Sequence, residues 1–66
     1  MNIELRFLQK AIEDKNFINF TYENQKLSKI KPLKLIEEEG VYTLKTYSKT
    51  YHFNKIKKLQ ISKEKF

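Results

Sequence analysis

The side chains best suited to binding chemistry in this chain are four lysines, one tyrosine and the only histidine. They are Lys29, Lys31, Lys45, Tyr47, His52 and Lys55. Ammonium groups attract phosphate, an exposed tyrosine ring offers a platform on which a base can stack, and an imidazole adds charge when protonated. These residues predict a surface that binds an anion such as single-stranded nucleic acid or a nucleotide. The plainer alternative is that Tyr47 and His52 are ordinary exposed strand residues.

Catalysis and metal binding have little support in the sequence. The chain has one histidine, no cysteine, no glycine-rich phosphate loop and no opposed pair of acids, so no nucleophile, base and orienting group can be assigned. Three consecutive glutamates, Glu37, Glu38 and Glu39, precede the only glycine, but adjacent carboxylates in a turn repel one another and face water. We therefore expect a protein that is not an enzyme and uses no metal or cofactor.

The charge distribution favours an anionic partner. The net charge is +6, from 14 Lys and Arg against 8 Asp and Glu. Between Gly40 and Lys63 the sequence has six lysines and no acid, which predicts one strongly positive region of the surface. The alternative is a solvated lysine-rich face that serves only solubility.

Length and composition limit the architecture to one domain, residues 1–66. A chain of about 60 residues buries only roughly 60% of its unfolded surface, and without cysteine no disulfide can supplement the core. The longest apolar run is far below the ~20 residues that span a membrane, and the N-terminus lacks a signal-peptide pattern. We therefore expect a soluble, cytoplasmic protein with no membrane partner.

Residues 3–15 are predicted to form an amphipathic helix, with Asn2 as its N-cap and Asn16 as its left-handed end. The apolar side chains that repeat with helical spacing predict a buried stripe. They are Leu5, Leu8, Ala11 and Ile12, with Phe7 beside them.

The rest of the chain shows the period-two alternation of strands. We expect a strand over residues 17–22, a turn at 23–26, a second strand over 27–36 that bends or bulges at Lys31-Pro32, and a turn at 37–40. A basic hairpin follows in residues 41–56, turning at 48–50. A short strand over 59–62, with Leu59 and Ile61 inward, ends the fold.

Within the hairpin, the aromatic and aliphatic residues predicted to be structural are Tyr42, Leu44, Tyr51 and Phe53. The predicted class is α+β, mainly β: an N-terminal helix followed by a small five-stranded antiparallel barrel of the Sm-like or SH3-like kind, at about residues 17–62.

The order and spacing of several short motifs over nearly the whole chain resemble a WYL domain, a small barrel module of bacterial regulators. The motifs are Leu8-Gln9-Lys10-Ala11-Ile12, Ile18-x-Phe20-x-Tyr22, Ile30-x-Pro32-x-x-Leu35, Gly40-x-Tyr42-Thr43-Leu44, residues 51–56 and a closing Phe66. The resemblance implies an Sm-like barrel that senses nucleic acid or a nucleotide-like ligand, as a regulatory part of a transcriptional regulator, a CRISPR-associated protein or a helicase.

Two positions that the resemblance assigns to ligand-contacting arginines hold His52 and Lys55 in this chain, and the family's naming Trp-Tyr-Leu triplet falls on Tyr42, Thr43 and Leu44. Lysine is a flexible point charge and lacks the bidentate fork of arginine. We therefore expect modest, salt-sensitive binding that tolerates changes of nucleic-acid sequence, with single-stranded DNA as the favoured ligand.

A second function class is a protein-interaction or oligomerisation module that has lost ligand binding. Small barrels can pair through exposed strand edges, which would give weak self-association or contacts with other domains of a parent protein.

Overall fold

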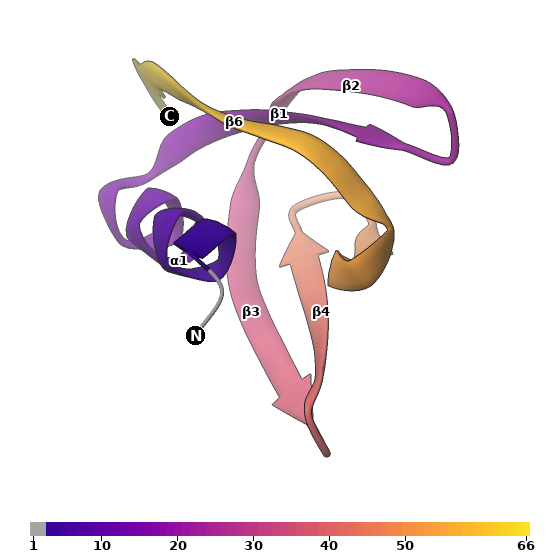
Figure 1. Cartoon of the computed structure of the whole chain (residues 1–66). Helices are drawn as coiled ribbons and strands as arrows, with labels where there is room; N and C mark the ends of the chain where they lie inside the picture. The colour runs from indigo at the N-terminus through magenta and orange to yellow at the C-terminus, as the bar shows by residue number, and fades with distance from the viewer. Residues whose placement is uncertain (1–2) are drawn as a thin grey trace.

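The computed structural model describes residues 3–66 and shows one helix followed by six strands (Figure 1). The elements are α1 (Ile3–Asp14), β1 (Asn16–Tyr22), β2 (Gln25–Ile30), β3 (Pro32–Glu38), β4 (Val41–Thr46), β5 (Thr50–His52), the 3₁₀ turn η1 (Phe53–Lys55) and β6 (Ile56–Lys65). The predicted α+β class, mainly β with an N-terminal helix, is confirmed.

The strands form two antiparallel three-stranded sheets, ordered β2-β1-β6 and β3-β4-β5. Within residues 3–66 the hydrogen-bonded ladders therefore do not close into the single five-stranded ring that we expected. The predicted strand over 27–36 is in fact two strands in different sheets, β2 and β3, with the break at Lys31. Pro32, which has no N–H to donate to a ladder, begins β3 and explains the break.

Helix α1 ends one residue earlier than predicted. Lys15, and not Asn16, takes the left-handed conformation (φ 58°), and Asn16 already belongs to β1. Leu5, Leu8 and Ala11 are buried as expected, but Phe7 is 54% exposed, so the prediction that it joins the stripe is wrong. The predicted N-cap, Asn2, lies outside the described residues.

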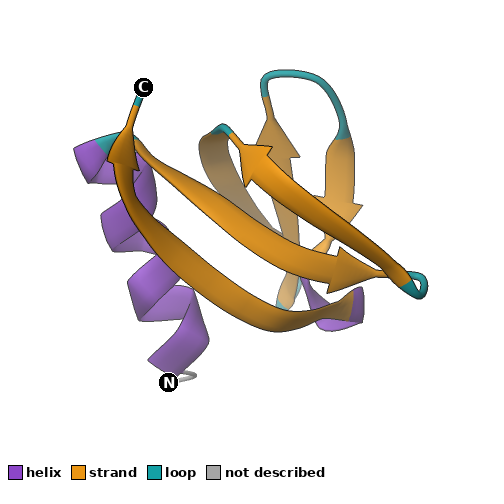
Figure 2. Cartoon of the chain, turned by 90° about the horizontal axis from the view of Figure 1, so that it is seen from above, coloured by secondary structure: helices purple, strands orange, loops and turns teal. Residues whose placement is uncertain are grey.

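The core lies between the two sheets and under α1, which contacts β1, β3 and β6 (Figure 2). Leu8, Ile18 and Leu44 are completely buried. The helix and the two sheets therefore each contribute one central side chain. Phe20 and Tyr51 meet edge to face with their ring centroids 5.1 Å apart. Burial of side chains of this size stabilises the fold by about 1.5–3 kcal/mol each, which makes this small cluster the main source of stability.

Two hairpins turn within two residues, both of which have positive φ. Glu23 and Asn24 connect β1 to β2 with φ values of 49° and 65°. Glu39 and Gly40 connect β3 to β4 with φ values of 51° and 81°. Positive φ at both central residues matches the right-handed twist of the flanking strands, so these turns set the register of their hairpins.

Strand β1 faces a one-residue β-bulge on each neighbouring strand, and its register with β6 shifts a second time between Asn16 and Ile18. On β2, Ser28 and Lys29 lie opposite the single residue Asn19, and on β6 Lys58 and Leu59 lie opposite Phe20. The lysine of each bulge takes the left-handed conformation, with φ values of 53° for Lys29 and 54° for Lys58. An extra residue bends a strand and increases its twist, so the paired bulges curve this sheet around the core.

Strand β6 is longer than predicted, since it covers Ile56–Lys65 and not only residues 59–62. Leu59 packs against the core as expected. Ile61 lies opposite the buried Ile18 but is 37% exposed, so its predicted burial is incomplete. The reason is its position, because β6 is an edge strand with no further strand to cover it.

Candidate nucleic-acid interface

The basic hairpin predicted over residues 41–56 forms from β4 and β5 alone, in which Thr43 pairs with His52 and Lys45 with Thr50. It ends at His52, because residues 53–55 form η1 and Ile56 begins β6 of the other sheet. The alternation is confirmed: Leu44 and Thr46 are buried, whereas Lys45 is exposed. Of the four residues predicted to be structural, Leu44 and Tyr51 are in the core. The other two, Tyr42 and Phe53, are half-buried and contact each other with ring centroids 6.5 Å apart.

The turn after β4 is held by one side chain, that of Thr46. Its hydroxyl donates a hydrogen bond to the carbonyl oxygen of Lys49 at 2.6 Å, and it accepts bonds from the N–H groups of Ser48 at 3.3 Å and Lys49 at 2.9 Å. Tyr47, the next residue, donates its backbone N–H to the carbonyl oxygen of Lys31 at 3.2 Å. These bonds fix the point at which the Tyr47 side chain leaves the backbone.

An aromatic cluster forms around Phe66, and we call Phe17, Lys31, Tyr47 and Phe66 the Phe66 cluster. The ring of Phe66 lies 5.3 Å from that of Phe17 and 5.7 Å from that of Tyr47, between centroids. The Lys31 ammonium lies 6.0 Å from the Phe66 centroid, at the edge of the cation–π range. Tyr47 is 60% exposed, so the cluster presents an aromatic surface with a cation beside it.

The surroundings of Lys45 and His52 differ in charge. Lys45 lies directly opposite Lys34 of β3, so two cations are neighbours on the outer face of the β3-β4-β5 sheet. His52 lies at a shallow hollow of about 430 Å³ that Glu38 and Glu39 also line. The two carboxylates make this end of the hairpin less favourable for phosphate than the end that bears Lys45.

The six predicted site residues do not form one surface. Lys31 and Tyr47 meet in the Phe66 cluster, and Lys45 shares a sheet face with His52. The remaining two lie elsewhere, Lys29 in the bulge of β2 and Lys55 in η1.

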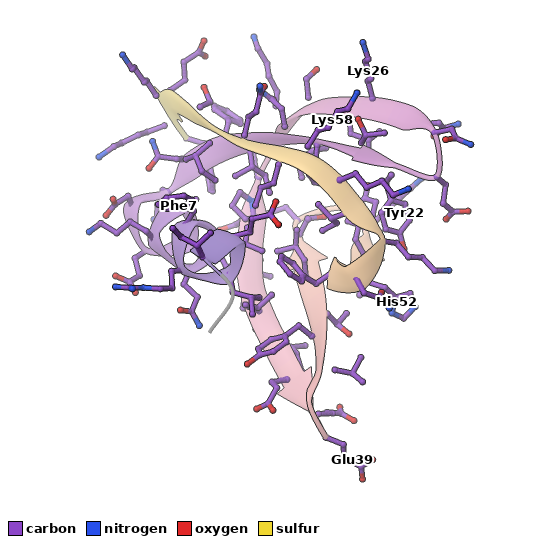
Figure 3. All side chains as sticks on the ribbon, in the orientation of Figure 1. Phe7, Tyr22, Lys26, Glu39, His52 and Lys58 are labelled. Carbon is purple, nitrogen blue, oxygen red and sulfur yellow. The ribbon has the colours of Figure 1, made fainter. Side chains whose placement is uncertain are left out.

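The predicted site residues do not include several others that the fold brings to these surfaces. Phe17 belongs to the Phe66 cluster through its ring contact with Phe66, and Lys34 lies beside Lys45 through the pairing of β3 with β4. No local pattern in the sequence specifies either contact. More lysines gather on the other sheet, on the outer face of β2-β1-β6, where Figure 3 shows Lys26 and Lys58 at one end of the molecule and Glu39 at the other. Only the sheet order, with β6 beside β1, could have revealed that face.

Residues 3–66 contain neither a metal-binding cluster nor a membrane-spanning helix. No group of three or more histidine or acidic side chains there could hold a metal ion. No helix in the same residues is long and apolar enough to cross a membrane. Comparisons of the whole chain with family models, curated proteins and solved structures found no match.

Proposed function

We propose that this protein is a non-catalytic, cytoplasmic domain that binds single-stranded nucleic acid, and that it serves as a regulatory or accessory part of a larger helicase or transcriptional regulator. The observation that carries the proposal is the Phe66 cluster. Single-stranded nucleic acids bind where aromatic rings stack on bases and cations attract the phosphates, without needing a deep pocket. The exposed ring of Tyr47, backed by Phe66 and adjacent to Lys31, has both properties.

The architecture is compatible with a WYL-like barrel in an open form. A helix followed by six short antiparallel strands, in two sheets that share a core, is the arrangement expected of an Sm-like or SH3-like barrel whose ladders are interrupted. Pro32 at the start of β3 accounts for the interruption between β2 and β3. The resemblance in sequence and this arrangement support the same proposal.

The test is fluorescence anisotropy with a labelled single strand of about 12 nucleotides, within the ~4–16 nucleotide range of small barrel domains. Tyr47→Ala should weaken binding by about 1–3 kcal/mol, or roughly 5- to 150-fold, if the ring stacks on a base. Tyr47→Phe should retain most of the affinity. Val41→Ala is the matched control, because Val41 is comparably exposed but lies beside the acidic turn. Absence of binding by the unaltered protein at low salt would overturn the proposal.

A second candidate function, protein interaction, is favoured by an apolar hollow of about 610 Å³ between α1 and β6. Phe7, Leu59 and Ile61 line it, and the Phe7 side chain is more than half exposed. Its position beside an edge strand suits contact with another domain or a second copy. Sedimentation at high concentration tests self-association: Phe7→Ser should abolish a dimer formed through this hollow, and a monomer at every concentration would exclude one.

A further inference from the structure

The positive charge of the protein is concentrated on the β2-β1-β6 sheet, and not on the sheet that contains the basic hairpin. The three strands β2, β1 and β6 contain six lysines and one acid. Strands β3, β4 and β5 contain two lysines and two acids. The acid of the first sheet, Glu64, lies near the end of β6, so the rest of the three strands carries lysines and no acid.

The register places two of these lysines on either side of one threonine. Thr21 of β1 pairs directly with Lys26 of β2 and with Lys57 of β6. Direct partners in a ladder share a face of the sheet, and two strand spacings separate the lysine backbones by roughly 10 Å. An anion that lies over Thr21 is therefore within reach of both lysine side chains.

The same face is hollowed and lined by hydrogen-bond donors. A shallow hollow of about 420 Å³ is lined by polar side chains of all three strands and by no acid. These side chains are Asn19, Thr21, Lys26, Ser28, Lys58 and Gln60. Hydroxyl, amide and ammonium groups are the groups with which proteins contact phosphate oxygens. We call the outer face formed by these residues together with Lys29 and Lys57 the basic sheet face.

The two bulges also put their lysines at this face. Lys58 lines the hollow, and Figure 3 shows it on the same side of the molecule as Lys26. Lys29 is held in its bulge because its backbone N–H donates a hydrogen bond to the side-chain oxygen of Asn19 at 2.9 Å. A left-handed conformation is unfavourable for lysine, so this hydrogen bond helps to keep Lys29 in the bulge.

We propose that the basic sheet face binds consecutive phosphates of a single-stranded nucleic acid. This inference rests on the proposed function and assigns the phosphate contacts to a surface distinct from the predicted hairpin. Lys29 lies two residues before Lys31, so the basic sheet face adjoins the Phe66 cluster at the end of β2. The phosphates follow the sheet, and bases at one end of the bound segment reach Tyr47.

The experiment compares two triple variants that remove the same charge from different surfaces. One is Lys26→Gln, Lys57→Gln and Lys58→Gln on the basic sheet face. The other is Lys45→Gln, Lys49→Gln and Lys55→Gln in the hairpin and η1. All six lysines are exposed, so both proteins should fold, which circular dichroism checks. Anisotropy titrations of a labelled single strand at several salt concentrations then give the salt dependence of the binding constant for each variant.

The sheet-face variant should lose the most affinity, and its plot of log K against log salt should become shallower by about 2, because each single-strand phosphate contact contributes about 0.7. The hairpin variant should change the slope by less than half as much. Equal losses in the two variants, or a larger loss in the hairpin variant, would overturn the inference and leave the proposed function intact.

Inorganic polyphosphate has phosphates but no bases, so its binding distinguishes the phosphate site on the basic sheet face from the proposed function of binding nucleic acid. If the unaltered protein binds polyphosphate through the sheet-face lysines but binds no nucleic acid, the proposed function fails and the phosphate site stands. If the sheet-face variant binds polyphosphate as well as the unaltered protein does, the phosphate site fails.

Discussion

The side-chain oxygen of Asn19 in β1 accepts a hydrogen bond from the backbone N–H of Lys29 at 2.9 Å, where β2 bulges opposite Asn19. The bulge leaves this N–H outside the regular ladder, so the Asn19 side chain provides the acceptor that the partner strand does not. An outward side chain of β1 thereby determines the backbone conformation of a lysine on the neighbouring strand.

Replacing Asn19 with alanine should destabilise the protein by about 1 kcal/mol, the usual net contribution of one hydrogen bond. Binding of a single strand should weaken as well, although no charge is removed, because the bulge loosens and the basic sheet face loses the Asn19 amide. Ser28→Ala is the control for stability alone, because it changes a side chain of the same bulge for which the structure shows no hydrogen bond to the bulge backbone. Urea unfolding measures the loss, and equal stability of the two variants would refute the role of Asn19.

Replacing Lys58 with glycine should stabilise the fold and weaken nucleic-acid binding at the same time. The left-handed conformation costs a lysine about 1–2 kcal/mol and glycine almost nothing, while the flexibility of glycine in the unfolded chain cancels part of the gain. We expect a net gain of about 0.5–1 kcal/mol. Lys57→Gly, one residue earlier in β6 and without a positive φ, should instead destabilise the protein. Denaturation midpoints of the two variants that shift in the same direction would contradict this prediction.

Local patterns in the sequence predicted the local structure well. Alternation identified β1 and the β4-β5 hairpin, and the break at Pro32 is present. The turn predicted at 37–40 forms at Gly40 but is shorter, because Glu37 and Glu38 belong to β3. Each of these features depends on residues within a few positions of one another. Burial of Leu8, Ile18 and Leu44 also followed from periodicity alone.

The arrangement of the surfaces could not be predicted, because it depends on which strands become neighbours. The acid-free region between Gly40 and Lys63 predicts one positive surface, but its lysines are divided between two sheets, because Lys45 belongs to β4 whereas Lys57, Lys58 and Lys63 belong to β6. Strand β6 pairs with β1, so its lysines join Lys26 on the other sheet. The left-handed conformation of Lys58 was equally unpredictable, since lysine gives no local sign of a bulge.

Replacing Thr46 with valine should destabilise the β4-β5 turn by about 1–3 kcal/mol, because the N–H of Lys49 loses its acceptor while the shape of the side chain is kept. Tyr47 follows directly and its position depends on this turn, so affinity for a single strand should fall too. Thr46→Ser keeps the hydroxyl and should lose only about 0.8 kcal/mol for the missing methyl group. Thermal unfolding ranks the variants, and a serine variant less stable than the valine variant would exclude the hydrogen-bond explanation.

Removing one negative charge should strengthen nucleic-acid binding if the charge lies near the basic sheet face, and should have no effect if it lies at the opposite end of the molecule. Glu23 lies in the β1-β2 turn beside the strand that bears Lys26, whereas Glu39 lies at the opposite end of a molecule whose longest dimension is 32 Å (Figure 3). At physiological salt, charges farther apart than about 8 Å are largely screened. Glu23→Gln should therefore raise affinity for a single strand by roughly 1.5- to 5-fold, the range expected for an exposed charge interaction of 0.2–1 kcal/mol. Glu39→Gln should leave the affinity unchanged at the same salt concentration. Because both variants change the net charge equally, an equal increase in both would mean that overall charge, and not the basic sheet face, governs binding.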